Sequence, residues 1–299
     1  MFIGTQKYIL VLIALLYVLV VIQVNADTKQ LQPCNQQIVV KKMRGNLAFG
    51  EMRKPPPGKS PSVWLGIFPQ ALVVDSHGAI YVADQVKYRI LKFNKHGKFL
   101  LKFTLQPAVK SKVGVTHLIP AMAVDANNRL YVINEDQDRI EIYKKDGEYI
   151  RSIDYSNDKI SHVRDDLYET GYRPDRINID ILGNIYLYDS LNSGGGVYSP
   201  NGKLLRIGIK VDTQGRGVVN YDETKMVGFN NLYYEFGSKK FFFDSLIIRD
   251  SKTNRIKQCA ITGLEALYVE RGIVSTMDKI GNVYVFDFRT LNIIKITLY

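Results

Sequence analysis

Short apolar stretches alternate with polar turns along most of the chain, and four of them repeat one spacing. Each begins with an Asp, has a Gly or Asn three residues later, a Tyr six residues later, and an Asp or Asn nine residues later. A period of about fifty residues built from short alternating strands is typical of a radial array of sheets. The pattern therefore predicts an all-β propeller. The four segments begin at Asp75, Asp125, Asp180 and Asp278.

Within a repeat the pattern divides into four strands. In the first repeat they are expected at residues 71–74, 80–83, 89–93 and 99–103. The turn at 75–78 joins the first two strands, because its Asp accepts backbone N–H bonds and its Gly adopts a positive φ. The repeats that begin at Asp125 and Asp180 follow the same frame. We therefore predict four-stranded antiparallel blades.

The two remaining repeats are incomplete. One is degenerate: with Tyr233 in the Tyr position, Val227 stands where the Asp is expected, although residues 245–261 still predict an outer hairpin. The last repeat ends at the C-terminus with three strands, and residues 37–41 near the N-terminus are the natural fourth, which would remove exposed sheet edges. Five repeats are visible, and a sixth blade built from residues 38–68 and irregular stretches stays open.

The run DSHGAIYVADQVKYRILKF from Asp75 resembles an NHL repeat, whose core is followed by a polar residue, His or Arg, and an aliphatic residue. Here that part is Tyr88-Arg89-Ile90, and in the next repeat Asp138-Arg139-Ile140. The third and fifth repeats have lost the Arg. The resemblance covers residues 71–299 and extends to the exported six-bladed propellers of bacteria. It implies a propeller of five to six blades, with six favoured by the resemblance.

The N-terminal segment indicates export. Residues 1–26 contain one charge, an apolar run at 8–22, and small residues suited to a signal peptidase, so they read as a signal peptide or as an uncleaved membrane anchor over residues 8–24. Residues 27–70 then hold the closing strand and a Pro-rich crossing segment. Export predicts a secreted or periplasmic protein. Cys34 and Cys259 would meet oxidising conditions there, and they are either bridged or two unpaired thiols.

The formal net charge of +11 is compatible with an anionic partner. It is also explained by a solvated rim, where charged side chains protect the outer edges of the sheets. Lys92, Lys95, Lys98 and Lys102 lie along the outer hairpin of the first repeat and favour the rim. Nucleic acid is not expected, since no basic cluster is interleaved with stacking aromatics. We therefore predict a protein or polysaccharide partner outside the cytoplasm. Contact with a membrane is expected only through an uncleaved leader.

Candidate chemistry gathers on the face that carries the loops between second and third strands. Asp84 with Arg89, and Asn134 with Arg139, are expected to be structural pairs. Acidic residues on this face would suit Ca²⁺, which prefers oxygen ligands, and these are Asp84, Glu135, Asp136, Asp189 and Asp287. Contact with a ligand is predicted for residues in or near the long loop 154–174, namely Tyr168, Tyr172, Arg164, Arg173 and Arg176.

A catalytic constellation is missing from the sequence. The four histidines are divided between opposite faces, which argues against the histidine-bound zinc of the amidating lyases in this family. We therefore predict an exported, non-catalytic binding scaffold for a protein or glycan ligand, without a cofactor. The alternative is a calcium-dependent hydrolase or lyase with its site in the central channel.

Overall fold

The computed structural model describes residues 32–41, 71–84, 87–106, 119–156, 174–180, 182–189, 194–207, 218–219, 225–230, 233–235, 240–242, 245–250, 256–260, 275–278, 280–287 and 291–297. By its internal contacts the chain divides into two units, residues 1–33 and 34–299, and all the strands given below belong to the second. The predicted leader and the Pro-rich segment lie outside the described residues. Within those ranges no helix is long and apolar enough to cross a membrane.

Four antiparallel four-stranded blades are described with their side chains. Blade A comprises β2 (Leu72–Val74), β3 (Ile80–Asp84), β4 (Arg89–Phe93) and β5 (Phe99–Thr104). Blade B comprises β6 (Met122–Val124), β7 (Leu130–Asn134), β8 (Arg139–Tyr143) and β9 (Tyr149–Asp154), with the short 3₁₀ helix η3 (Glu135–Gln137) between β7 and β8. Blade C comprises β10 (Arg176–Ile179), β11 (Ile185–Asp189), β12 (Gly194–Tyr198) and β13 (Leu204–Ile207). The closing blade comprises β20 (Ser275–Met277), β21 (Val283–Asp287), β22 (Asn292–Thr297) and β1 (Asn35–Val40).

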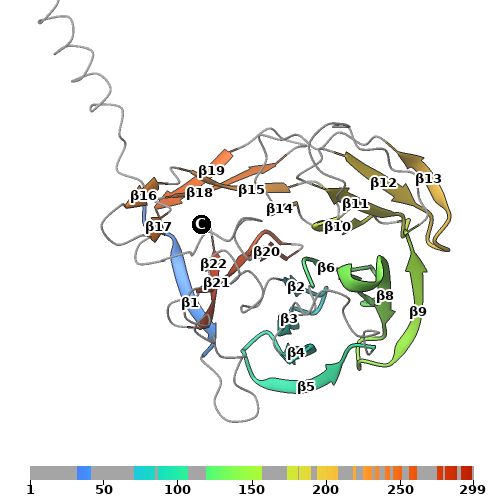
Figure 1. The fold of residues 1–299 in the computed structure, drawn as a ribbon. Coiled ribbons are helices and arrows are strands. Elements are labelled where there is room, and N and C mark those ends of the chain that lie inside the picture. The colour runs from blue at the N-terminus through green and yellow to red at the C-terminus, as the bar shows by residue number, and fades with distance from the viewer. Residues whose placement is uncertain are drawn as a thin grey trace, which may run out of the picture. The chain divides into compact units, whose positions relative to one another are not determined.

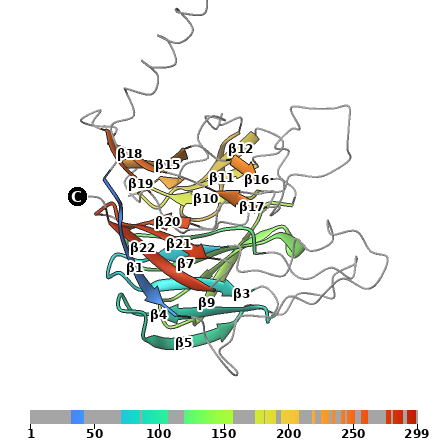
Figure 2. The same cartoon turned by 90° about the vertical axis from the view of Figure 1, so that its left-hand side faces the viewer.

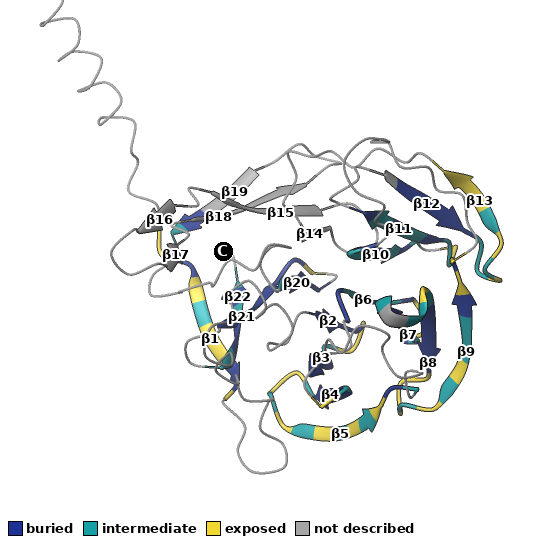
Figure 3. Ribbon diagram, viewed as in Figure 1, coloured by how far each residue is buried: buried dark blue, intermediate teal, exposed yellow. Residues whose placement is uncertain are grey.

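The blades meet through their first strands, as a propeller requires. Strand β2 contacts β20 on one side and β6 on the other, and β6 in turn contacts β10 (Figure 1). The apolar core lies between neighbouring blades. Blade A buries both faces, since Val82 belongs to the cluster shared with the closing blade and Tyr81 to the cluster shared with blade B. The second and third strands of blade A are therefore completely buried, whereas its outer strand β5 alternates between half-buried and exposed residues (Figure 3). This explains why the central strands read as apolar runs.

The predicted closing strand is confirmed. Strand β1 pairs antiparallel with β22, with Gln37 opposite Lys295 and Val40 opposite Ile293 beyond a bulge. Figure 2 shows β1 running along β22, so the first and last strands of the chain share one sheet. The closing blade thus receives the fourth strand that the last repeat lacks.

The degenerate repeat differs from its prediction. A further four-stranded sheet contains β14 (Val218–Val219), β15 (Lys225–Asn230), β18 (Ser245–Asp250) and β19 (Ile256–Ala260), so the outer hairpin is confirmed. Tyr233, however, lies in β16 (Tyr233–Glu235), which pairs only with β17 (Lys240–Phe242). Val227 lies within β15, opposite Ile248, because without an Asp it cannot form the inner turn. Five or six blades were predicted, and four are described with their side chains.

The repeated Asp holds the inner turn of each blade. In blade B, Asp125 Oδ1 accepts the backbone N–H groups of Asn127 at 2.9 Å and Arg129 at 2.8 Å, while Oδ2 accepts the hydroxyl of Tyr131 at 3.3 Å. The residue three positions after the Asp has a positive φ, 59° for Asn128. The same Asp to Tyr bond of 3.3 Å recurs in the other three blades. The spacing of six residues thus records a hydrogen bond between a turn and the buried second strand.

These tyrosines predict a loss of stability at high pH. Burial is the larger cause and the charge of Asp125 the second, and together they raise the pKa of Tyr131 to about 12. Burial and the charge of the corresponding turn Asp raise the pKa of Tyr81 and of Tyr284 further. A folded-state pKa above the unfolded value of about 10 contributes stability below pH 10 and loses it as pH rises. Urea unfolding should therefore give a lower free energy at pH 11 than at pH 8. The Tyr131→Phe variant should show a shallower fall, and identical free energies at the two pH values in the natural protein would contradict the prediction.

The outer turns carry the contacts between successive blades. A Cβ built on Gly97 would lie 1.4 Å from the carbonyl oxygen of Val39, one on Gly147 would lie 2.6 Å from the ring of Phe103, and one on Gly202 would lie 2.9 Å from Ile153. In each case the turn glycine of one blade rests on the outer strand of the blade before it. Glycine is required because the approach leaves no room for a side chain.

One of the predicted rim lysines is buried between blades. The Nζ of Lys92 donates to the carbonyl of Lys145 in the outer turn of blade B at 2.7 Å and lies 4.7 Å from the ring centroid of Tyr81. Burial lowers the pKa of Lys92. Lys95, Lys98 and Lys102 are exposed, as a solvated rim predicts. Lys92 differs because its side chain lies on the face that packs against the next blade.

We expect the Gly147→Ala variant to lose about 1 to 3 kcal/mol of unfolding free energy, since it combines a strained positive φ with a forced shift of Phe103. The matched control is Gly183→Ala. Gly183 has a similar φ of 83°, but its added Cβ would lie 3.3 Å from Pro200, so this variant isolates the backbone strain. Chemical denaturation of both measures the difference. Equal losses would show that the contact between turn and neighbouring strand is unimportant.

Candidate functional site

The end of the second strand holds a buried polar residue in every described blade. Asp84, Asn134, Asp189 and Asp287 expose at most 3% of their surface, and each lies opposite the first residue of the third strand. In blade A the pair is a buried ion pair, with Arg89 Nε 2.9 Å from Asp84 Oδ2. The Asp84 and Arg89 pair was predicted and is confirmed. It holds the ends of β3 and β4 together at the loop.

Blade B departs from this arrangement. Asn134 stands where blade A has Asp84, and Arg139 turns to Glu141, its Nη2 lying 2.6 Å and its Nε 3.0 Å from Oε1 of that carboxylate. The expectation that Asn134 and Arg139 repeat the blade A pair is therefore wrong. Because an amide carries no charge, the guanidinium binds the nearest carboxylate instead.

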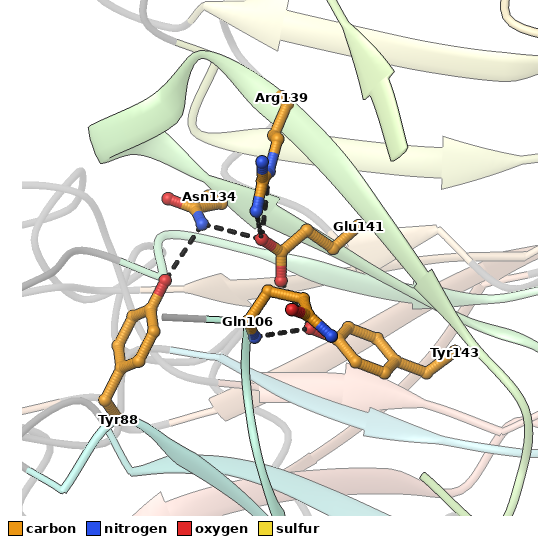
Figure 4. A network of polar contacts seen from close by, with 6 residues as sticks. All are labelled: Tyr88, Gln106, Asn134, Arg139, Glu141 and Tyr143. Atoms are coloured by element: carbon orange, nitrogen blue, oxygen red, sulfur yellow. Dashed lines mark hydrogen bonds and ion pairs between the residues drawn. The ribbon is translucent and has the colours of Figure 1, made fainter. Parts of the chain in front are cut away.

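Glu141 is completely buried in the middle of strand β8. Its Oε1 also accepts the amide Nδ2 of Asn134 at 2.8 Å, and its Oε2 accepts the hydroxyl of Tyr143 (Figure 4). A buried carboxylate is stable only when such donors surround it. Glu141 was missed as a candidate, and the available signal was a single acidic residue within the apolar strand sequence RIEIY.

Glu141 and its three partners, Asn134, Arg139 and Tyr143, form what we call the Glu141 cluster. This cluster also connects blade A to blade B. Asn134 Nδ2 donates to the hydroxyl of Tyr88 at 2.9 Å, and the backbone N–H of Gln106 donates to the hydroxyl of Tyr143 at 3.1 Å (Figure 4). Tyr88 precedes β4 and Gln106 follows β5, so both come from blade A. Burial, and then the hydrogen bond to Glu141, raise the pKa of Tyr143. The cluster is thus a polar contact between blades A and B, beside the apolar cluster that the two blades share.

One acceptor of the cluster is left over. Among the described residues, Asn134 Oδ1 is buried and has no hydrogen-bond partner. Arg139 is more accessible, with 25% of its side chain exposed against 8% for Arg89. With Glu141 satisfied by internal donors, the arrangement offers hydrogen bonds at the loop face and no poised base or nucleophile.

Most of the predicted ligand residues cannot be placed. Tyr168, Tyr172, Arg164 and Arg173 lie outside the described residues, and Arg176 begins the half-buried strand β10. Their contact with a ligand stays a prediction.

The predicted acidic set is spread over separate strand ends. Asp84, Asp189 and Asp287 end β3, β11 and β21, while Glu135 and Asp136 lie in η3. Within the described ranges, no group of three or more His, Cys, Asp or Glu side chains is close enough to hold a metal ion. Calcium binding by this predicted set stays a prediction.

Cys34 and Cys259 form a disulfide. The backbone N–H of Cys34 also donates to the carbonyl of Ala260 at 2.8 Å, so the start of β1 is attached to β19 as well as to β22.

The comparisons with known proteins concern the fold. No family model matches the chain, and no curated protein matches it. Among solved structures, virginiamycin B lyase from Staphylococcus aureus aligns at 12% identity over 89% of this chain and 74% of that chain, with a TM-score of 0.39. A streptogramin B lyase aligns at 14% identity over 82% and 68%, with a TM-score of 0.35, and U3-55K at 10% identity over 77% and 95%, with a TM-score of 0.46. These likenesses carry no inference about function. The chain is an all-β propeller of four-stranded antiparallel blades, and its resemblance to NHL repeats stays a prediction.

Proposed function

We propose that this protein is an exported, non-catalytic binding module that holds a protein or glycan ligand on its loop face, the end of the blades that carries the loops between second and third strands. The observation that supports this most directly is the Glu141 cluster. Its one carboxylate is fully engaged by Arg139, Asn134 and Tyr143, so the cluster contributes positioned hydrogen-bonding groups to that face. Rigid sheets that present loops are the usual scaffold for binding sites.

The long loop 154–174 belongs to the same proposal. It follows β9, the outer strand of blade B, and therefore leaves the sheet at the same end as the loop between β7 and β8. Tyr168, Tyr172 and Arg173 are its candidate contact residues. We further propose that the sheet β14, β15, β18 and β19 is a fifth blade, which its four-stranded pairing supports.

The proposal is tested with the full chain, expressed with its own leader, on a glycan array and in a pull-down from an extracellular fraction. The triple variant Tyr168→Ala, Tyr172→Ala, Arg173→Ala should bind at least about tenfold more weakly. The control carries Lys95→Ala and His96→Ala, which change the outer turn at the opposite end of blade A and should leave binding unchanged. If the natural protein captures neither glycan nor protein, the proposed function is wrong.

A further inference from the structure

Blades A and B share one backbone frame but place their carboxylate differently. By register, Asp84, Leu91 and Phe93 of blade A correspond to Asn134, Glu141 and Tyr143 of blade B. The carboxylate has moved from the end of the second strand to the middle of the third, and an aromatic hydroxyl has been added to bind it. The three differences therefore act as one unit that turns Arg139 toward Glu141 on its own strand and leaves an uncharged amide at the end of the second strand.

The orientation of the Asn134 amide is determined by its neighbours. Its Nδ2 lies 2.8 Å from Glu141 Oε1, and the reverse orientation would set a carbonyl oxygen against that carboxylate. The amide oxygen is consequently directed away from Glu141 (Figure 4). Asn134 is 1% exposed, and its Oδ1 has no partner among the described residues. Leaving such an acceptor unsatisfied is unfavourable, so this oxygen requires a donor from outside the cluster.

Arg139 supplies a donor beside this acceptor. A guanidinium carries five N–H groups on three nitrogens. Within the described residues, the hydrogen bonds of Arg139 use Nε and Nη2, both to Glu141, which leaves Nη1 available on a side chain that is one quarter exposed. Asn134 and Arg139 are direct cross-strand partners, so both side chains start from neighbouring backbone positions at the ends of β7 and β8.

From these groups we infer that the ligand is a neutral carbohydrate, with one hydroxyl donating to Asn134 Oδ1 and a neighbouring hydroxyl accepting from Arg139 Nη1. Sugar hydroxyls provide both donors and acceptors without a charge. An anion would meet the amide oxygen with Glu141 behind it, and a cation would meet Arg139. Blade A cannot offer the same site, because there Arg89 is bound to Asp84 and is largely buried. This inference rests on the proposed function and identifies its ligand class.

The test gives blade B the residues of blade A. The variant Asn134→Asp, Glu141→Leu, Tyr143→Phe recreates the blade A set, which already folds in this chain with Arg89 paired to Asp84. On an array of neutral and acidic glycans, we expect the natural protein to bind neutral glycans and this variant, still folded, to bind at least about tenfold more weakly. If the triple variant fails to fold, Arg139→Lys provides the second test. It keeps the positive charge next to Glu141 but removes the additional N–H donors, and it should weaken binding similarly.

The outcomes separate this inference from the proposed function. Neutral glycan binding that survives in the folded triple variant and in Arg139→Lys overturns the site while leaving the binding module intact. Exclusive binding of acidic glycans, or capture of a protein with no glycan bound, overturns the ligand class alone. Absence of any captured glycan or protein removes both.

Discussion

Removing the disulfide between Cys34 and Cys259 should lower the free energy of unfolding by up to about 5 kcal/mol. The bond joins residues 225 positions apart, and on the loop-entropy model a closed loop of that length restricts the unfolded chain strongly. Both cysteines are buried, and Cys34 directly precedes the closing strand β1. Without the bond, β1 keeps its pairing with β22, the backbone hydrogen bond from Cys34 to Ala260 and the core packing of Val39 and Val40.

This effect is measured on the Cys34→Ala, Cys259→Ala variant by urea unfolding monitored by tyrosine fluorescence. The natural protein treated with a reductant under denaturing conditions, and then refolded reduced, should match the double variant. Each single alanine variant is a poorer comparison because it leaves a free thiol. A change in melting temperature of less than a few degrees would show that β1 pairing alone closes the propeller.

Replacing Glu141 by Leu should destabilise the protein by about 3 kcal/mol. Removing one partner of a buried ion pair leaves the other without compensation, at a typical loss of about 3 to 5 kcal/mol, and the lower end applies because the Arg139 side chain is one quarter exposed. Asn134 and Tyr143 lose their acceptor at the same time. A poor fit of the leucine side chain is not the cause of this loss of stability, since blade A buries Leu91 at the corresponding position.

A double-mutant cycle separates these causes. The variant Asn134→Asp, Glu141→Leu returns a carboxylate to the site where blade A has one, so it should recover most of the loss. The single variant Asn134→Asp should itself be destabilised, because it sets two carboxylates around one guanidinium. If the losses of unfolding free energy in the two single variants simply add in the double variant, Arg139 does not move from Glu141 to the new carboxylate at position 134, and the comparison of the two blades is wrong.

Much of the fold could be predicted because the decisive interactions are local and repeated. The turn Asp binds backbone groups two and four residues ahead, so each inner turn is contained within a short sequence. The closing strand could be predicted because the last repeat has three strands and residues 37–41 have the composition of a fourth. The placement of Tyr233 in the second strand of its repeat is wrong, because a Tyr without the turn Asp six residues before it does not mark that strand.

The candidate site was predicted less well because it depends on a difference between repeats. A search for shared positions selects Asp84 and Asp189, whereas Glu141 occurs in one blade and has no counterpart to mark it. Its partner could not be inferred either, since Arg139 faces both Asn134 across the strands and Glu141 along its own strand. Burial decided between them, because a buried carboxylate needs the cation more than a buried amide does.

The pairing of β1 with β22 also affects the order of events during synthesis. Among the described strands, β1 leaves the ribosome first, and its partner β22 emerges after all the others. Blade A can assemble early, since its four strands are consecutive, but the outer turn at Gly97 has no Val39 to rest on until β1 is in place. A nascent chain therefore carries an unpaired edge strand through nearly the whole of translation, a period when chaperones would have to protect it from pairing with other chains.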